Sequence, residues 1–356
     1  MERAKIVSGS KKKPKTMADI AKLAGVSTST ASRALQDSAL ISPRTKARVQ
    51  ATAQKYRYQP NLVARHLRLG KSNTLALVLP MNAPGNEIWS DPFVLKFLGA
   101  VGFGLQTRGY NLIVSQTSRV DARFQEQYLG ANRVEGLILL GRGQDYACLN
   151  QLASGKVPFV VWGPIFPDQR YCSVGIDNIA SAEQVVRHLL RLGRRRIAII
   201  ADRAETQASE SRLRWQGYKN ALADAGIQID PKLETSATYS GASGYEAMRS
   251  LLQSAPDLDA VFVAYSDAVA IAAMQALQDA GRRIPDDVSL IGFDDIDLAA
   301  FTTPPLTTVS QRLSEGGVDL LIQKLVAQMD GKKTSSVMLD GQLVVRQSCG
   351  TRLFSH

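Results

Sequence analysis

The ten residues "VSTSTASRAL" at positions 26–35 place five hydroxyl side chains around one arginine. Short hydroxyl side chains let a helix approach another molecule closely, and a guanidinium can fork onto a guanine or hold a phosphate. A helix with this surface has the chemistry to contact nucleic acid. The same residues, taken alone, also fit a polar exposed helix in any all-α subdomain, so the surrounding sequence must decide between the two.

The charge of the first part of the chain favours the nucleic-acid interpretation. Residues 1–71 hold 16 Lys and Arg against 3 Asp and Glu, whereas the rest of the 356-residue chain holds 27 against 29. A small basic unit on a near-neutral body is typical of a module that neutralises phosphates. The lysines within positions 11–15 would alone fit a solvated, disordered tail, so the prediction depends on the whole basic head.

The elements that must position these side chains begin with a helix just before them. Thr16 is placed to cap this helix, Asp19 stands three residues later as the acid of a capping box, and Gly25 is placed to end it. The apolar positions at three- and four-residue spacing, which we expect to face inward, are Ile20, Leu23 and Ala24.

A second helix is expected to carry the hydroxyl-rich segment itself, with Ser27 as its cap. Two short helices joined by a glycine-containing turn form a helix-turn-helix, whose second helix presents its N-terminal residues to base edges in the major groove. Ala31, Ala34 and Leu35 are predicted to face inward, and Thr28, Ser29, Ser32 and Arg33 to face outward.

Two further helices are predicted in the head. Ser42 as cap and Pro43 at the first helical position begin the third, which closes a small core with Val49, Ala53 and Tyr56. Pro60 breaks it, and Asn61 can cap a fourth helix of about two turns that ends at Gly70. So short a helix is marginal in water, which predicts a hinge that orders only with support from DNA and a second copy.

The segments "TMADIAKLAGVSTSTASRAL", "SPRTKARV" and "YQPNLVARHLRLG" resemble the DNA-binding head and hinge of the LacI/GalR family of bacterial repressors. The resemblance implies that Thr28, Ser29 and Arg33 read bases and that Leu67 wedges into the minor groove, where an apolar side chain bends the duplex. It places backbone contacts at Ser27, Thr30, Ser42, Thr45 and Asn61, and we add Thr16 and Tyr58 to the expected DNA contacts.

From residue 74 onward, apolar strands alternate with amphipathic helices, which predicts an α/β body with parallel sheets covered on both faces. Several of the helices end at a glycine, namely Gly109, Gly193, Gly226 and Gly281. The predicted strands are "TLALVLP", "YNLIVSQ", "VEGLILL", "VPFVVWG", "RIAIIAD", "LDAVFVA" and "VSLIGFDD".

Ligands of such sheets bind beyond the carboxyl ends of the strands. The candidates at those positions are Asp91, Phe93, Arg214, Tyr239, Ser266 with Asp267, and Asp294. "GFDD" followed by "PPLTTVSQ" resembles the same family's effector domain, a pair of periplasmic-binding-protein-like lobes, and the resemblance assigns Arg214 and Asp294 to the effector. A guanidinium and a carboxylate can bracket adjacent hydroxyls, while Tyr239, Phe93, Trp89 or Trp162 offer flat faces to a sugar ring.

Structural alternatives remain open for several of these residues. Asp294 and Asp295 can end a strand and cap the following short helix, and Asp267 can be a helix cap. Arg214 can pair with Glu210 at helical spacing. Trp162 can be a core residue, and at this position the sequence departs from relatives that carry a polar ligand-binding side chain.

Composition excludes several other classes of protein. Cys148, Cys172 and Cys349 lie far apart, which argues against disulfides or a zinc site and favours a reducing compartment. The N-terminus lacks the apolar region of a signal peptide, and no run of eighteen apolar residues follows, so a cytoplasmic protein without membrane spans is expected. "GRGQDY" lacks the third glycine of a dinucleotide site, and the acidic group at 294–297 lacks the features of a calcium loop, so no cofactor or metal is expected.

The predicted organisation is a basic tail (1–15), a helix-turn-helix domain (16–60), a hinge (61–72) and an effector-binding and dimerisation domain (73–356). We predict a homodimeric repressor that binds a pseudo-palindromic operator and is released by a small molecule, by resemblance a carbohydrate. A purine-like co-repressor or a protein co-regulator is the alternative effector. An enzyme fused to the head would need catalytic residues or a phosphate-cradling glycine loop, which the sequence does not present.

Overall fold

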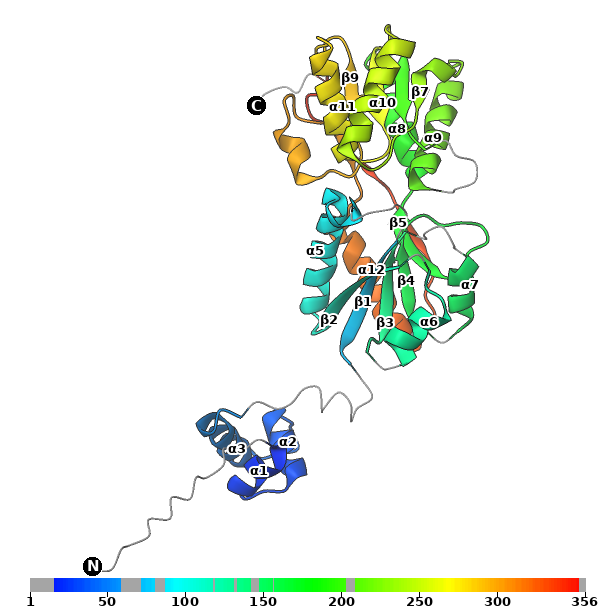
Figure 1. Ribbon diagram of the computed structural model, residues 1–356. Coiled ribbons are helices and arrows are strands. Elements are labelled where there is room, and N and C mark those ends of the chain that lie inside the picture. The colour runs from blue at the N-terminus through cyan, green and yellow to red at the C-terminus, as the bar shows by residue number, and fades with distance from the viewer. Residues whose placement is uncertain are drawn as a thin grey trace, which may run out of the picture. The chain divides into compact units, whose positions relative to one another are not determined.

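The computed structural model describes residues 16–58, 72–80, 87–117, 119–130, 133–141, 147–155, 157–202 and 209–351. Contacts within the chain divide it into two units, Met1–Ser72 and Asn73–His356, called here the head and the body (Figure 1). The expected tail and the hinge contacts at Asn61 and Leu67 lie outside the described residues.

The head consists of α1 (Met17–Leu23), α2 (Thr28–Leu35) and α3 (Pro43–Lys55), each with the cap predicted from the sequence. Thr16 Oγ1 accepts a hydrogen bond from the Asp19 amide at 3.2 Å, and Asp19 Oδ2 accepts one from the Thr16 amide at 3.0 Å. Ser27 and Ser42 likewise accept from the amides three residues later. Each cap satisfies amides that the first helical turn leaves without partners, so these sequence signals fix where the helices begin.

The core of the head is made mostly of small side chains, and Val49, Ala31 and Ala34 are fully buried in it. One inward-facing prediction is wrong, because the Leu23 side chain is 50% exposed. The buried residues of α1 and its C-cap are Ile20, Ala21 and Ala24. At 100° per residue these three centre the buried face about 100° away from Leu23, which leaves that leucine on the flank of the short helix.

The body contains two lobes, each built on a parallel sheet as the sequence predicts. In the N-lobe the strand order is β11-β5-β4-β3-β1-β2, and in the C-lobe it is β7-β6-β8-β9. The N-lobe strands are β1 (Thr74–Pro80), β2 (Asn111–Thr117), β3 (Gly136–Leu140), β4 (Phe159–Trp162), β5 (Cys172–Ile176) and β11 (Val337–Leu339). The C-lobe strands are β6 (Ile197–Ile200), β7 (Glu234–Thr235), β8 (Ala260–Val263) and β9 (Ser289–Ile291).

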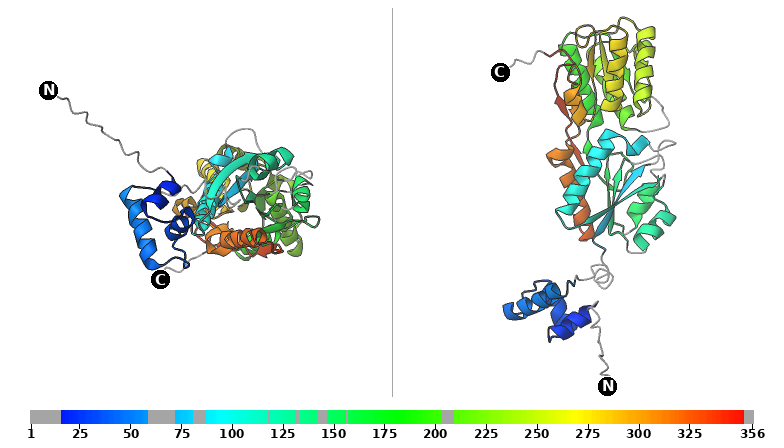
Figure 2. Two further views of the ribbon diagram at one scale, coloured as in Figure 1. Left: turned by 90° about the horizontal axis from the view of Figure 1, so that it is seen from below. Right: turned by 60° about the vertical axis from the view of Figure 1, so that its left-hand side comes forward.

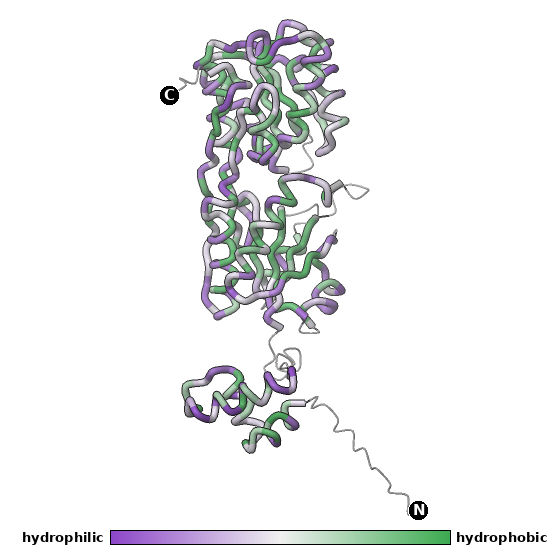
Figure 3. The backbone as a smooth tube through the Cα atoms, turned by 90° about the vertical axis from the view of Figure 1, so that its left-hand side faces the viewer, coloured by the Kyte–Doolittle hydropathy of each residue, from purple (hydrophilic) through white to green (hydrophobic). Residues whose placement is uncertain are grey.

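Helices cover both faces of each sheet (Figures 1 and 2). In the N-lobe, α5 (Pro92–Gln106) and α12 (Val318–Met329) cover one face, while α6 (Ala122–Gln125) and α7 (Ala147–Ser154) cover the other. In the C-lobe, α8 (Asn178–Arg191) and α9 (Glu210–Asp224) lie opposite α10 (Gly241–Ser254) and α11 (Asp267–Asp279). The strands are apolar on both faces for this reason, which Figure 3 shows as hydrophobic colour along them.

Alternate residues of one strand belong to different cores. In β6, Ala198 and Ile200 pack with α10 and α11, whereas Ile197 and Ile199 pack with α8 and α9. This is the period of two that a pleated strand imposes. Each sheet is therefore held on both sides by buried aliphatic side chains, and its strand ends are rigid platforms for polar residues.

The chain crosses between the lobes at three places. It leaves the N-lobe after β5 and returns after β10 (Thr308–Ser310) through the turn η5 (Leu313–Gly317) to α12. After β11 it crosses again to β12 (Gln342–Val344), which pairs antiparallel with β10. Each lobe is thus assembled from segments that are distant in the sequence.

The structure contains all seven predicted strands within a few residues of their expected bounds. The four glycines expected to end helices have φ between 69° and 87°, the left-handed region that glycine adopts without strain. The sequence analysis missed β5, β7, β10, β11 and β12. They lie outside the longer apolar segments from which the other strands were predicted; β9 is as short as β10, but it lies within the predicted segment "VSLIGFDD".

Candidate functional site

The exposed face of α2 has the features expected of a nucleic-acid interface. Thr28, Ser29 and Arg33 are exposed, whereas Ala31 and Ala34 are fully buried. Within the described chain, the Arg33 guanidinium makes no hydrogen bond or ion pair. Its five N–H donors are available to a partner.

The hydroxyl groups at the N-terminus of α2 form a small network. Ser27 Oγ lies 2.9 Å from Ser29 Oγ and 2.8 Å from Thr30 Oγ1. Ser42 Oγ donates to Thr45 Oγ1 at 3.0 Å at the start of α3. Because a hydroxyl both donates and accepts, these groups can still bind phosphate oxygens while they cap their helices.

Further cations surround these groups on the head. Among the head's described residues, Lys46 pairs with Asp37 at 2.8 Å. The exposed Lys and Arg residues of the described head are Lys22, Arg33, Arg44, Arg48, Lys55 and Arg57. Thr16 is exposed and Tyr58 is partly buried, so both predicted DNA contacts reach the surface of the head.

A second group of functional side chains gathers between the lobes, and its N-lobe members stand at the start of α5. Asp91 caps α5, and its Oδ1 accepts from the amides of Phe93 at 2.8 Å and Val94 at 3.3 Å. Burial raises the pKa of the Asp91 carboxyl, while these two amides oppose the shift. Phe93 stacks on Phe97 at 6.4 Å and contacts the buried clusters of both lobes.

Arg214 is the buried cation of this interlobe site. Its Nε donates to Asn178 Oδ1 at 2.8 Å, and its Nη1 donates to the carbonyls of Ala264 and Tyr265 at 3.0 and 2.9 Å. The guanidinium lies 3.4 Å from the centre of the Phe293 ring, an arrangement that orients the fork. Nη2 has no partner among the residues described, so one edge of the fork remains for a ligand.

Asp294 follows β9 and has φ 108°, a backbone conformation that residues with a side chain rarely adopt. Its amide donates to the Val309 carbonyl at 2.9 Å, which helps to hold this conformation. Burial raises the pKa of the Asp294 carboxyl well above its usual range, Arg214 opposes the shift, and the charges of Asp267 and Asp91 add to it. Asp91, Arg214 and Asp294 therefore lie near enough for their charges to interact.

Gln311 links Asp294 to the N-lobe, and the sequence analysis missed its role. Its Nε2 donates to Asp294 Oδ1 at 2.6 Å, and its Oε1 accepts from Trp162 Nε1 at 3.3 Å. Trp162 is buried in the N-lobe core against Phe97, so its interpretation as a core residue is confirmed, and its indole N–H also supports the site. Gln311 lies within the quoted "PPLTTVSQ" motif, which was the signal available in the sequence.

Two other predicted residues flank the site from the C-lobe. The Tyr239 side chain is 47% exposed and packs edge-on against Tyr265 with ring centres 5.2 Å apart. The charges of Glu210, Arg214 and Asp294 act on its hydroxyl. Ser266 is buried and caps α11 through Val269, so its hydroxyl already has a structural partner.

Several cap and pair alternatives are wrong. Asp295 pairs with Arg346 at 2.7 Å. The short helix η4 (Asp297–Phe301) has no side-chain cap, so neither Asp294 nor Asp295 caps it. Asp267 does not cap α11; its carboxylate accepts from the Ile296 amide at 3.0 Å and Thr308 Oγ1 at 2.6 Å.

The pair between Arg214 and Glu210 is also absent. In the part of the chain that the structure describes, the Glu210 carboxylate makes neither a hydrogen bond nor an ion pair. The Arg214 fork turns instead toward backbone carbonyls, which are fixed acceptors at the ends of rigid elements.

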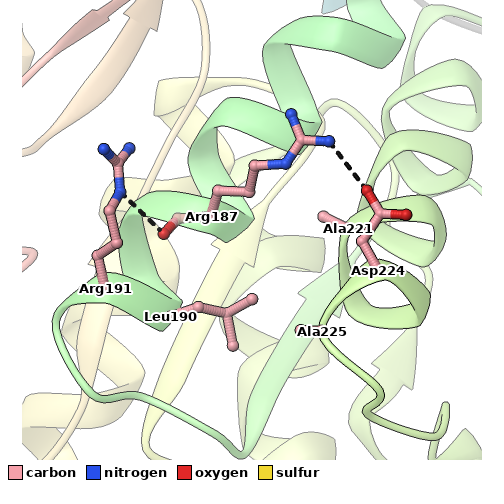
Figure 4. A pocket seen from close by; sticks show the side chains of 6 residues that line it. All are labelled: Arg187, Leu190, Arg191, Ala221, Asp224 and Ala225. Atoms are coloured by element: carbon pink, nitrogen blue, oxygen red, sulfur yellow. Dashed lines mark hydrogen bonds and ion pairs between the residues drawn. The ribbon is translucent and has the colours of Figure 1, made fainter.

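A groove between α8 and α9 is lined by the residues drawn in Figure 4. Its polar groups are engaged with each other, since Arg187 pairs with Asp224 at 3.0 Å and Arg191 Nε donates to the Arg187 carbonyl at 3.3 Å. None of its residues belongs to the predicted site. The described residues contain no cluster of His, Cys, Asp or Glu suited to a metal ion, and no helix among them has the length and apolar character for a membrane span.

Comparisons with families and curated proteins agree on both units of the chain. Residues 16–61 match the family described as "Bacterial regulatory proteins, lacI family", and residues 186–349 match the family "Periplasmic binding protein-like domain". The transcriptional regulator CelR of Thermobifida fusca is 35% identical over 338 residues, which cover 94% of this chain and 98% of CelR. The repressor CytR of Escherichia coli (strain K12) is 30% identical over 94% of this chain and 96% of CytR.

Solved structures show the same likeness. A lac repressor dimer bound to operator and the anti-inducer ONPF matches with a TM-score of 0.80 at 26% identity, over 95% of this chain and 99% of that one. A CelR–cellobiose complex matches with a TM-score of 0.67 at 32% identity, over 94% and 100% of the two chains. The likeness therefore extends over the head and the body together.

Proposed function

Because the chain belongs to the LacI family of bacterial regulatory proteins, we propose that it represses transcription by binding a pseudo-palindromic double-stranded DNA operator under effector control. The observation that carries this proposal is the exposed face of α2, where Thr28, Ser29 and the unpaired Arg33 stand side by side. Short hydroxyls followed one turn later by a free guanidinium suit a helix that enters the major groove.

We assign the contacts by chemistry. Base contacts belong to Thr28, Ser29 and Arg33, while the capping hydroxyls and the flanking cations hold phosphates and set the register. The phosphate set is Thr16, Ser27, Thr30, Ser42, Thr45 and Tyr58, and Asn61 and Leu67 remain assignments from the sequence.

We propose that the effector is a carbohydrate that binds between the lobes and releases the operator. Arg214 Nη2 supplies a donor, the oxygens of Asp91 and Asp294 without described partners supply acceptors, and Phe93 and Tyr239 supply apolar faces. Ser266 completes the proposed set. A CelR structure in complex with cellobiose and a relative named as a ribose operon repressor support a sugar.

A homodimer is part of the proposal, because one recognition helix reads few base pairs. Leu95 and Phe103 on one face of α5 are 49% and 71% exposed, and Phe301 on η4 is 80% exposed. Lys96 Nζ donates to the Asp295 carbonyl at 2.7 Å and pairs with Asp297, which brings α5 and η4 together. Such an apolar surface on a body of this size supports association with a second copy.

CelR, CytR and the ribose operon repressor are all regulators or repressors by name. This supports the proposal that the chain is a regulatory protein and catalyses no reaction. A DNA operator as partner requires the compartment that holds the chromosome. We therefore place the protein in the cytoplasm.

The test begins with selection of an operator from randomised DNA by the full-length protein, followed by fluorescence anisotropy with a panel of sugars and nucleobases. We expect sequence-specific binding that one sugar weakens at least fivefold, the size of a typical coupling between two sites. Asp294→Ala should bind the operator as the parent does and lose the response. A response at the parental effector concentration in that variant would remove Asp294 from the effector site.

A further inference from the structure

Glu210 is a C-lobe residue whose carboxylate reaches the N-lobe strand ends. It is the first residue of α9, after the cap Ser209. A Cβ atom placed on Gly141, just after β3, would lie 3.5 Å from Glu210 Oε1, and one placed on Gly163, just after β4, would lie 3.6 Å away. The carboxylate therefore lies beside the carboxyl ends of two adjacent strands of the other lobe, the edge at which ligands of parallel sheets bind.

This carboxylate has no protein donor among the described residues. The Gly141 amide donates to the Trp162 carbonyl at 2.8 Å, and the Gly163 amide donates to the Val174 carbonyl at 3.0 Å, so neither amide is available. Arg214, one turn farther along α9, directs Nε and Nη1 to other acceptors. A partly buried carboxylate without a protein donor must take its hydrogen bonds from water or a ligand.

The surrounding charges select which ligand can supply those donors. The charges of Asp91 and Asp267 act on Asp294, and the charge of Glu210 acts on both Arg214 and Tyr239. Four carboxyls therefore share this region. Among the described residues, Arg214 is the cation that acts on Asp294, and its Nε and Nη1 already donate to protein acceptors, so only Nη2 is left for a ligand. A hydroxyl group brings a donor without charge, whereas a phosphate or carboxylate brings a like charge and no donor.

We propose that Glu210 is a specificity-determining residue of the interlobe site, which accepts hydrogen bonds from hydroxyls of an uncharged sugar and disfavours a phosphorylated or carboxylated one. The inference rests on the proposed effector site and names the charge class of its ligand. Gly141 and Gly163 present only backbone to the carboxylate, and a Cβ atom at either position would be in ordinary van der Waals contact with it.

The test compares neutral sugars with their phosphates by titration calorimetry on the full-length protein. The pairs are cellobiose and cellobiose 6′-phosphate, ribose and ribose 5-phosphate, and glucose and glucose 6-phosphate. We expect the parent to bind the neutral member of one pair at least a hundredfold more tightly than its phosphate. Glu210→Gln keeps the size of the side chain and removes its charge, and should reduce that ratio at least tenfold while it weakens the neutral sugar by less than tenfold.

Two further variants make the result independent of folding defects. Glu246→Gln removes a carboxylate that pairs with Arg249 on the surface of α10 and should leave the ratio at the parental value. Glu210→Ala removes both charge and acceptor, and should relax the ratio as Glu210→Gln does while it weakens the neutral sugar further.

Parental discrimination in both Glu210 variants would overturn the proposal and leave the sugar-responsive repressor intact. A parent that prefers a phosphorylated sugar would also overturn it. If no sugar binds or shifts operator affinity, the proposed effector class itself is wrong and this inference fails with it.

Discussion

The substitution Gln311→Ala tests whether the polar connection between the lobes stabilises the body. Gln311 is 7% exposed and holds one hydrogen bond to Asp294 and one to Trp162. Its removal leaves a buried carboxyl oxygen and a buried indole N–H without partners, and each costs about 1–3 kcal/mol. Allowing for the vacated space, we expect the free energy of unfolding to fall by about 3–5 kcal/mol.

The assay is urea unfolding followed by circular dichroism and tryptophan fluorescence. The matched control is Gln275→Ala, because Gln275 Nε2 donates to Asp279 Oδ1 at 2.7 Å on the exposed surface of α11. This control has the same pair of groups without the burial, and it should lower the free energy of unfolding by less than about 0.5 kcal/mol.

A double-mutant cycle then isolates the bond to the indole. Trp162→Phe keeps an aromatic ring against Phe97 and removes the Nε1 donor. Because the two side chains share the hydrogen bond at 3.3 Å, the costs of Trp162→Phe and Gln311→Ala overlap, and the double variant should lose at least about 0.5 kcal/mol less than their sum. A cost for Gln311→Ala equal to that of Gln275→Ala, or strict additivity in the cycle, would refute the reasoning.

Three other predictions concern the remaining parts of the molecule. Arg33→Ala should weaken operator binding by about 1–3 kcal/mol in anisotropy titrations and relax base preference at one position, whereas an even loss across all sequences would reassign Arg33 to a phosphate. Phe103→Asp should shift sedimentation toward the monomer, and an unchanged dimer would exclude the α5 surface. Burial raises the pKa of Asp267 to about 7, above the ordinary 3.8, so its contribution to stability is full below about pH 4 and is lost as pH rises to about 7. That loss is about 4 kcal/mol. In urea unfolding from pH 4.5 to 8.5, the free energy of unfolding of Asp267→Asn should therefore rise relative to that of the parent up to about pH 7, and the difference should then stay constant. A difference that does not depend on pH contradicts the assignment.

The sequence predicted best the features that depend on neighbouring residues. The caps at Thr16, Ser27 and Ser42 are interactions across three residues, so type and spacing were sufficient. The long apolar strand β1 was found with its full bounds, whereas β10 was missed because its sequence, Thr-Val-Ser, has a single apolar side chain.

The site was predicted in part for the same reason. Asp91, Arg214 and Asp294 follow strand ends or match a family motif, and parallel topology brings such positions to one edge. The partner of Asp295 is Arg346, 51 residues later, and local patterns led to the wrong prediction of a cap. Glu210 was considered only as a partner for Arg214, because its approach to Gly141 and Gly163 depends on how the two lobes meet.

The three crossings between the lobes have a consequence for biosynthesis. The described head is one continuous stretch, 16–58, which can fold as soon as it leaves the ribosome. The covering helix α12 of the N-lobe is complete only after residue 329 has been made, and the edge strand β11 only after residue 339. The C-lobe receives β12 later still. Nascent chains therefore carry a folded DNA-binding head long before either lobe is finished. A chain whose synthesis stops near residue 310 would lack α12 and β11 of the N-lobe and β12 of the C-lobe.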